Sequence, residues 1–258
     1  MAFPKFLGCD LSIPTYTWNS GVDSLYPVSN MKNGYPDIYS KAGTTTLAQY
    51  ILIDFGTAVS FNAALVDGIN FSSVGADNGI KFQVNTNDDT NWADAVTLGT
   101  FTASDSAQML TFATQSKRYA RILFDSTGAL VAKPYIGNLF IGTTLDFEKS
   151  YQWGAVAQMP THNVNTSEAL DGRIRSAVNA GGRYIWELEF KLHSDSFITS
   201  WRSFLLTVKN SAAPFYYIDP DGAIWCVVLD ANYNPATMFR YNLNDLQKLR
   251  IKTVLSNY

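Results

Sequence analysis

The chain has 258 residues, which is enough for one large domain or two ordinary ones. It is 47% hydrophobic and 14% aromatic but only 16% charged, a composition that favours β structure and argues against disorder. The formal net charge of −3 provides no positive field for binding nucleic acid, and no apolar run is long enough for membrane insertion.

Short strands are predicted throughout the first part of the chain. Runs rich in aromatic and β-branched residues, bounded by Gly, Asn, Asp or Ser, lie at residues 50–55, 63–71, 80–86, 107–113 and 119–125. In the third run, Ile80, Phe82 and Val84 alternate with polar residues, so one face should be buried. Several such strands without a helical period between them predict an antiparallel β-sandwich.

A domain boundary is predicted near Leu145. An apolar cluster ends at Ile141, and a polar, loop-like stretch follows at residues 157–172. The sequence therefore predicts two domains, residues 1–145 and residues 146–258.

The second domain should begin with a β-hairpin. Two strand-like runs, residues 172–178 and 183–192, flank the segment from Asn179 to Gly182, whose composition suits a tight turn. In the second run, apolar residues share one face and charged residues share the other.

One helix is predicted at residues 196–209, because apolar residues recur there at spacings of 3, 4 and 7. The apolar stripe consists of Phe197, Ile198, Trp201, Phe204, Leu205 and Val208. Further strands are predicted at residues 214–219, 223–230, 238–243 and about 249–255. The stripe must be buried, so the expected fold is mainly β, with two β-sandwich domains and one helix packed on the second.

No motif for catalysis or for a cofactor is present, and we expect neither. His162 and His193 have no acidic or cysteine neighbours at metal-ligand spacing. Cys9 and Cys226 are too few for a disulfide framework, and two buried free thiols are favoured over a single bridge between them.

Two pairs of carboxylates have alternative interpretations. Glu187 and Glu189 would lie on one face of a strand and could suit a glycosidase, but the solvated side of a hairpin is the simpler interpretation. Asp88 and Asp89 could hold calcium at a loop tip, and a plain polar turn is again simpler. We predict no metal site.

Aromatic residues near the N-terminus are the remaining route to a sugar site. Tyr16, Trp18, Tyr26, Tyr35 and Tyr39 cluster in a loop-rich segment, and aromatic faces stack well on pyranose rings. The same residues could instead fill a subunit interface, where Tyr and Trp are enriched. The candidate glycan contacts are Trp18, Tyr35 and Tyr39.

The order of the segments resembles that of two phage tail domains. YPVSNMKNG at residues 26–34, followed by YILIDFG, AALVDGINF, KRYARILFD and YIGNLFIG, resembles a galactose-binding-like, discoidin-type jelly roll. GGRYIWELEFKL, the helix after it and APFYYIDPDG resemble the tail-tube-like domain of siphophage tail-tip proteins.

The resemblance implies a structural protein of a phage tail tip, made in the host cytoplasm and located in the virion. It would form a homo-oligomeric ring, a hexamer or trimer, that joins the tail tube to the distal tip, with other tail tube and tip proteins as partners and DNA only as passing cargo. The ring interface would involve Arg173, Arg175, Arg183, Glu187 and Glu189. The alternative is a tail protein that binds host-surface glycans through its N-terminal jelly roll.

Overall fold

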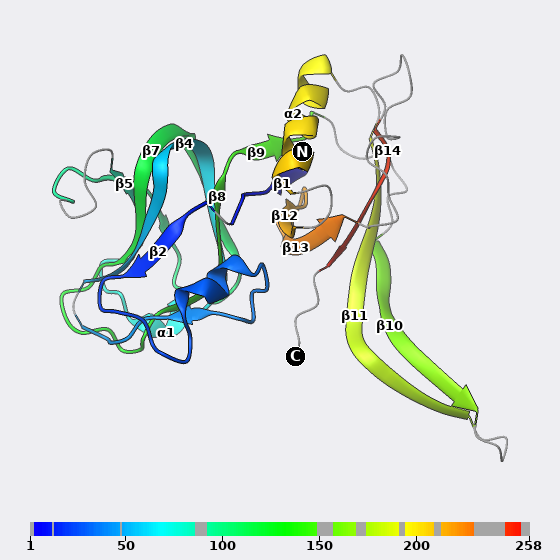
Figure 1. The fold of residues 1–258 in the computed structure, drawn as a ribbon, viewed down its shortest axis with the longest axis horizontal. Coiled ribbons are helices and arrows are strands. Elements are labelled where there is room, and N and C mark those ends of the chain that lie inside the picture. The colour runs from blue at the N-terminus through cyan, green and yellow to red at the C-terminus, as the bar shows by residue number, and fades with distance from the viewer. Residues whose placement is uncertain are drawn as a thin grey trace. The chain divides into compact units, whose positions relative to one another are not determined.

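The computed structural model describes residues 3–11, 13–46, 48–85, 92–148, 157–168, 174–190, 194–208, 213–229 and 246–253 (Figure 1). The chain forms two compact units. We call Leu7–Thr144 the sandwich unit, and we call Met1–Phe6 together with Leu145–Tyr258 the helix-bearing unit. Strands dominate both units, so the predicted mainly β class is confirmed.

The sandwich unit is built around a sheet with the strand order β3-β8-β4-β7-β5-β6, with β2 also paired to β4. Its strands are β2 (Thr15–Trp18), β3 (Ser40–Lys41), β4 (Gln49–Ile69), β5 (Ile80–Asn85), β6 (Val96–Phe101), β7 (Gln108–Phe124) and β8 (Tyr135–Gly142). Two short helices, η1 (Val28–Lys32) and α1 (Phe71–Val74), lie in the connections.

The two long strands, β4 and β7, each join segments that the sequence predicted separately. The β4–β7 register shifts between Asp54 and Val59, and Gly56 has a φ of 74° there. Beyond this shift β4 exchanges β2 for β8 as its second neighbour. The irregularity lets one continuous strand take part in two pairings.

The core of the sandwich unit follows the pleat of its strands. Ile80, Phe82 and Val84 are 2%, 0% and 1% exposed, which confirms the predicted alternation. On the neighbouring β7 strand Ile122 and Phe124 are also buried. Because side chains alternate along a strand, the residues between them occupy the outer face of the sheet.

The helix-bearing unit contains a sheet with the order β10-β11-β14-β13-β12-β1-β9. Its strands are β1 (Lys5–Leu7), β9 (Thr144–Asp146), β10 (Ala157–Glu168), β11 (Ile174–Phe190), β12 (Phe215–Ile218), β13 (Ile224–Leu229) and β14 (Leu246–Thr253). The strand predicted at residues 238–243 lies outside the described residues.

Helix α2 (Asp195–Thr207) matches the predicted helix closely. The Oγ atom of Ser194 accepts the backbone N–H of Phe197 at 3.1 Å, so Ser194 is the N-cap residue. All six residues of the predicted apolar stripe are buried, and five of them belong to the same hydrophobic cluster as the buried residues of β12, β13 and β14.

The N-terminal residues depart from the predicted division at residue 145, because residues 1–6 belong to the helix-bearing unit. Phe6 on β1 is fully buried there. Its ring centroid lies 4.9–6.1 Å from the rings of Phe147, Trp201, Phe204, Phe215 and Tyr217. A three-residue strand is too short to show a period, so its place in the sheet could not be predicted from the sequence.

The hairpin of the helix-bearing unit is β10–β11, and here the sequence prediction was wrong in two ways. Residues 157–168 form a strand rather than a loop, and the expected turn at residues 179–182 lies inside β11. Thr161 pairs with Arg183 and Asn163 with Ala180, so the two glycines between them fall in a register shift. Glycine inside a strand commonly marks such a bulge.

Candidate functional site

Trp18 was predicted as a glycan contact, and the structure corrects this. The side chain is 3% exposed, and its Nε1–H donates to the Oγ atom of Ser40 at 3.0 Å. Its ring stacks on Phe124 with centroids 6.0 Å apart. Tyr16, two residues earlier on β2, is also buried, because both point from the strand into the core.

Tyr39 is part of a stack of three tyrosine rings. Its centroid lies 4.8 Å from that of Tyr26 and 4.3 Å from that of Tyr135. The hydrogen bond with Tyr26, together with burial, raises the pKa of the Tyr39 hydroxyl. Both faces of Tyr39 are therefore already in contact with protein. Of the three predicted glycan contacts, Tyr35 is the exposed one, at 46%.

The predicted oligomer interface is described only in part. Arg173 lies outside the described residues, and so do the side chains of Arg175, Arg183 and Glu189, whose backbone belongs to β11. The Oε1 atom of Glu187 lies 3.9 Å from Nε of Arg250 on the neighbouring strand β14. The interface role of these residues stays a prediction.

Metal and membrane sites were not expected. In the part of the chain that the structure describes, no three His, Cys, Asp or Glu side chains gather as a metal site, and Asp88 and Asp89 lie outside that part. None of the described helices has the length and apolarity needed to cross a membrane. Cys9 and Cys226 are not joined by a disulfide in this structure, and both are only partly buried, whereas buried thiols were expected.

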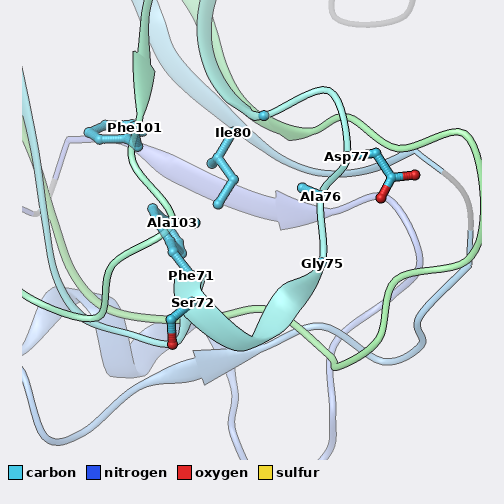
Figure 2. Close-up of a pocket in the computed structure, with 9 residues that line it drawn as sticks. Phe71, Ser72, Gly75, Ala76, Asp77, Ile80, Phe101 and Ala103 are labelled. Carbon is cyan, nitrogen blue, oxygen red and sulfur yellow. The ribbon is translucent and has the colours of Figure 1, made fainter.

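A pocket of about 180 Å³ lies beside α1 (Figure 2). Phe71, Ile80 and Phe101 supply much of its apolar lining. Its two polar side chains already have protein partners. The backbone N–H and the hydroxyl of Ser72 donate to the carboxylate of Asp105 at 2.8 Å and 2.6 Å, and the Oδ2 atom of Asp77 accepts from the hydroxyls of Ser126 and Thr127 at 3.3 Å and 2.9 Å. A pocket whose polar groups bond to the protein offers a ligand little besides apolar contact.

A surface that combines charged and aromatic side chains lies on the outer face of β4, β5 and β7. We call it the arginine face, and it consists of Tyr50, Lys81, Gln83, Trp92, Arg121 and Asp125. The strand residues reach this face because the alternate positions of each strand fill the core. Trp92 comes from the connection between β5 and β6.

Arg121 is at the centre of the arginine face. Its guanidinium carbon lies 4.3 Å from the ring centroid of Trp92 and 5.2 Å from that of Tyr50. These distances are within the range of cation–π contacts. The Nε–H of Arg121 donates to the Oε1 atom of Gln83 at 2.8 Å. The guanidinium is thus held by two rings and one hydrogen bond.

The charges of the arginine face do not cancel. Lys81 and Asp125 form an ion pair with 2.6 Å between Nζ and Oδ2, and this contact lowers the pKa of Asp125. Burial lowers the pKa of Arg121, while Tyr50 and Asp125 oppose that shift. An arginine remains protonated in a protein, so the six described residues of the arginine face together carry a net charge of about +1.

No family model and no curated protein matches the chain. Among solved structures, chitosan-binding module 1 of a chitosanase/glucanase from Paenibacillus sp. IK-5 is 15% identical, with 51% of this chain and 97% of that chain covered and a TM-score of 0.42. The module CpGH89CBM32-5 from Clostridium perfringens, in complex with GalNAc-β-1,3-galactose, is 14% identical, with 52% and 99% covered and a TM-score of 0.40. Likeness at this level assigns no function, and the tail-protein resemblance stays a prediction.

Proposed function

We propose that the protein is a non-catalytic carbohydrate-binding protein and that its sandwich unit holds the glycan on the arginine face. The observation that carries this proposal is the state of Arg121. Among the described residues, its one hydrogen bond runs from Nε to Gln83, and none of them supplies an acceptor for Nη1 or Nη2. A ligand that supplies a hydrogen-bond acceptor to these partly buried N–H donors therefore lowers the free energy of the complex.

The surroundings of Arg121 suit a sugar. Hydroxyl and ring oxygens accept hydrogen bonds from guanidinium N–H groups, and Trp92 and Tyr50 add aromatic surface beside them. The Lys81–Asp125 pair adds a further donor and acceptor at the same face. A few fixed polar groups between aromatic walls are typical of small-ligand sites.

The test is a glycan array probed with the full chain, followed by calorimetric titration of the best glycan. Trp92→Ala removes one wall of the site and should weaken binding about tenfold, in line with the loss of one stacked ring. Tyr35→Ala is the matched control, because Tyr35 is exposed and lies outside the arginine face. No binding on the array, or an equal loss in both variants, would contradict the proposal.

A second function, self-assembly, is favoured by the β10–β11 hairpin. Strand β14 pairs with β11 from Ile185 to Phe190, whereas the residues from Ile174 to Arg183 have β10 as their partner among the described strands. The hairpin extends beyond the other strands of its sheet (Figure 1). An isolated two-stranded ribbon is marginally stable in water, and its free edges can pair with another chain.

We propose that the β10–β11 hairpin, which we call the arm, docks on a neighbouring subunit. The sequence resemblance supports placing the assembly in a phage tail tip, as a ring between the tail tube and the distal end, with the arginine face turned to host glycans. Light scattering of the full chain over a concentration range would test assembly. Replacing residues 162–182 by Asn-Gly should give a monomer that still binds glycan, and an unchanged oligomer would count against the arm.

A further inference from the structure

The direction in which Arg121 points is set by a chain of hydrogen bonds across three strands. The Nε2–H of Gln83 on β5 donates to the Oγ1 atom of Thr97 on β6 at 2.9 Å. This bond leaves the Oε1 atom of Gln83 facing β7, where it accepts the Nε–H of Arg121 at 2.8 Å. Gln83 is the register partner of both Thr97 and Arg121, so the pairing of the backbones places these three side chains in one row.

The guanidinium is left with one usable edge. Trp92 and Tyr50 contact the guanidinium, and Nε is engaged with Gln83. The Nη1 and Nη2 atoms form the remaining edge, and no described carboxylate pairs with it. Holding this edge in place before a ligand arrives reduces the entropy that binding costs.

A second arginine on the same strand provides the contrast. Arg118 donates from Nε and Nη2 to the two carboxylate oxygens of Asp54, at 2.9 Å and 3.1 Å. That bidentate contact is what a guanidinium edge normally makes with a carboxylate. Arg121 instead presents its other edge, Nη1 and Nη2, and no carboxylate among the described residues is bonded to that edge, since Asp125 is bound by Lys81.

We infer that the ligand of the arginine face is an acidic glycan and that Nη1 and Nη2 of Arg121 receive its carboxylate. This inference rests on the proposed carbohydrate-binding function and adds the class of sugar, a uronic or sialic acid. A carboxylate matches both the planar edge and the uncompensated charge, whereas a hydroxyl matches neither as well. Trp92 and Tyr50 keep the guanidinium partly desolvated, which strengthens the charged contact.

The experiment compares each acid with its own methyl ester, which has the same sugar but no charge. The full chain is titrated with a galacturonate trimer, with sialyllactose, and with the methyl ester of each. We expect the protein to bind at least one of the acids about tenfold more tightly than its ester, as for a charge-assisted hydrogen bond. Equal affinity for acid and ester would overturn the inference while leaving the carbohydrate-binding function intact.

Two variants with the same change of charge decide whether the contact is specific. Arg121→Gln should remove the preference for the acid, and Arg118→Gln should keep it, because Arg118 is occupied by Asp54. Equal losses in the two variants would mean that the attraction is diffuse and would overturn the bidentate contact. If neither acid nor ester is bound, and the array also shows no glycan, then the inference and the proposed function fail together.

Discussion

Gln83 and Arg121 face each other across β5 and β7, and the 2.8 Å hydrogen bond between them makes Gln83 the residue that positions the guanidinium. Gln83→Glu should therefore occupy Arg121 with a protein carboxylate and weaken binding of the acidic glycan about tenfold. Gln83→Leu should free the guanidinium and give a smaller loss. Calorimetry with acid and ester measures both, and equal binding by the glutamate variant and the wild type would contradict the positioning role.

The Lys81–Asp125 ion pair should make stability depend on pH. The pKa of Asp125 is lowered mainly by its hydrogen bond with Lys81, so its contribution is complete above the pKa of an unfolded Asp, about 3.9. The contribution is lost as the pH falls through the lower folded value. Both side chains are 30% exposed, so we expect Lys81→Gln to cost about 0.5 kcal/mol near neutral pH.

Urea unfolding at a series of pH values measures this effect. The difference in unfolding free energy between wild type and Lys81→Gln should disappear in acid, where Asp125 is protonated in both proteins. A difference that persists unchanged into acid would show that Lys81 acts through packing instead of through its charge.

Gly137 on β8 should not tolerate a side chain. A Cβ atom there would overlap the carbonyl oxygen of Pro36 and lie 2.7 Å from its carbonyl carbon. We expect Gly137→Ala to destabilise the sandwich unit by about 2–3 kcal/mol. Gly128→Ala is the control, since its Cβ would meet nothing within 4 Å, and it should stay within about 0.5 kcal/mol of wild type. Equal unfolding midpoints in urea would refute the overlap.

Phe6 should stabilise the helix-bearing unit and not the sandwich unit. Removal of a fully buried phenylalanine typically costs about 3–5 kcal/mol, so Phe6→Ala should sharply lower hydrogen-exchange protection in α2 and β12. Protection of β5 should not change. Phe3→Ala is the matched control, because Phe3 is 46% exposed. Loss of protection in β5 would show that the two units unfold together.

The sequence predicts a helix or strand well where one side of that element is buried and the other is exposed. The stripe of α2 and the alternation of β5 both show in the sequence, because burial imposes a period on the residues. Strand β10 shows no such period, since its polar residues carry no apolar face that would distinguish a strand from a loop. Residues 157–168 are a strand because they pair with β11, and the sequence of these residues alone does not reveal that pairing.

The candidate site was less accessible to sequence reasoning. In Thr15–Trp18 the aromatic residues alternate with threonines, and this period was a signal that Tyr16 and Trp18 point inward together. The outward direction of Arg121 follows from the same rule applied to β7. The contact between Arg121 and Trp92 could not be predicted in this way. Trp92 lies in the connection between β5 and β6, and the sequence pattern does not tell where a connection packs on a sheet.

The place of β1 has a consequence for how the protein is made. Lys5–Leu7 is synthesised before the sandwich unit, yet its partner strand β12 at Phe215–Ile218 follows only after the whole sandwich unit has been synthesised. The sandwich unit is an insertion between two parts of the helix-bearing unit, and it can fold while the chain is still growing. Phe6 must wait for the rings that bury it, so an N-terminal fusion should disturb the assembly of the distant C-terminal sheet before it affects the domain that follows it in sequence.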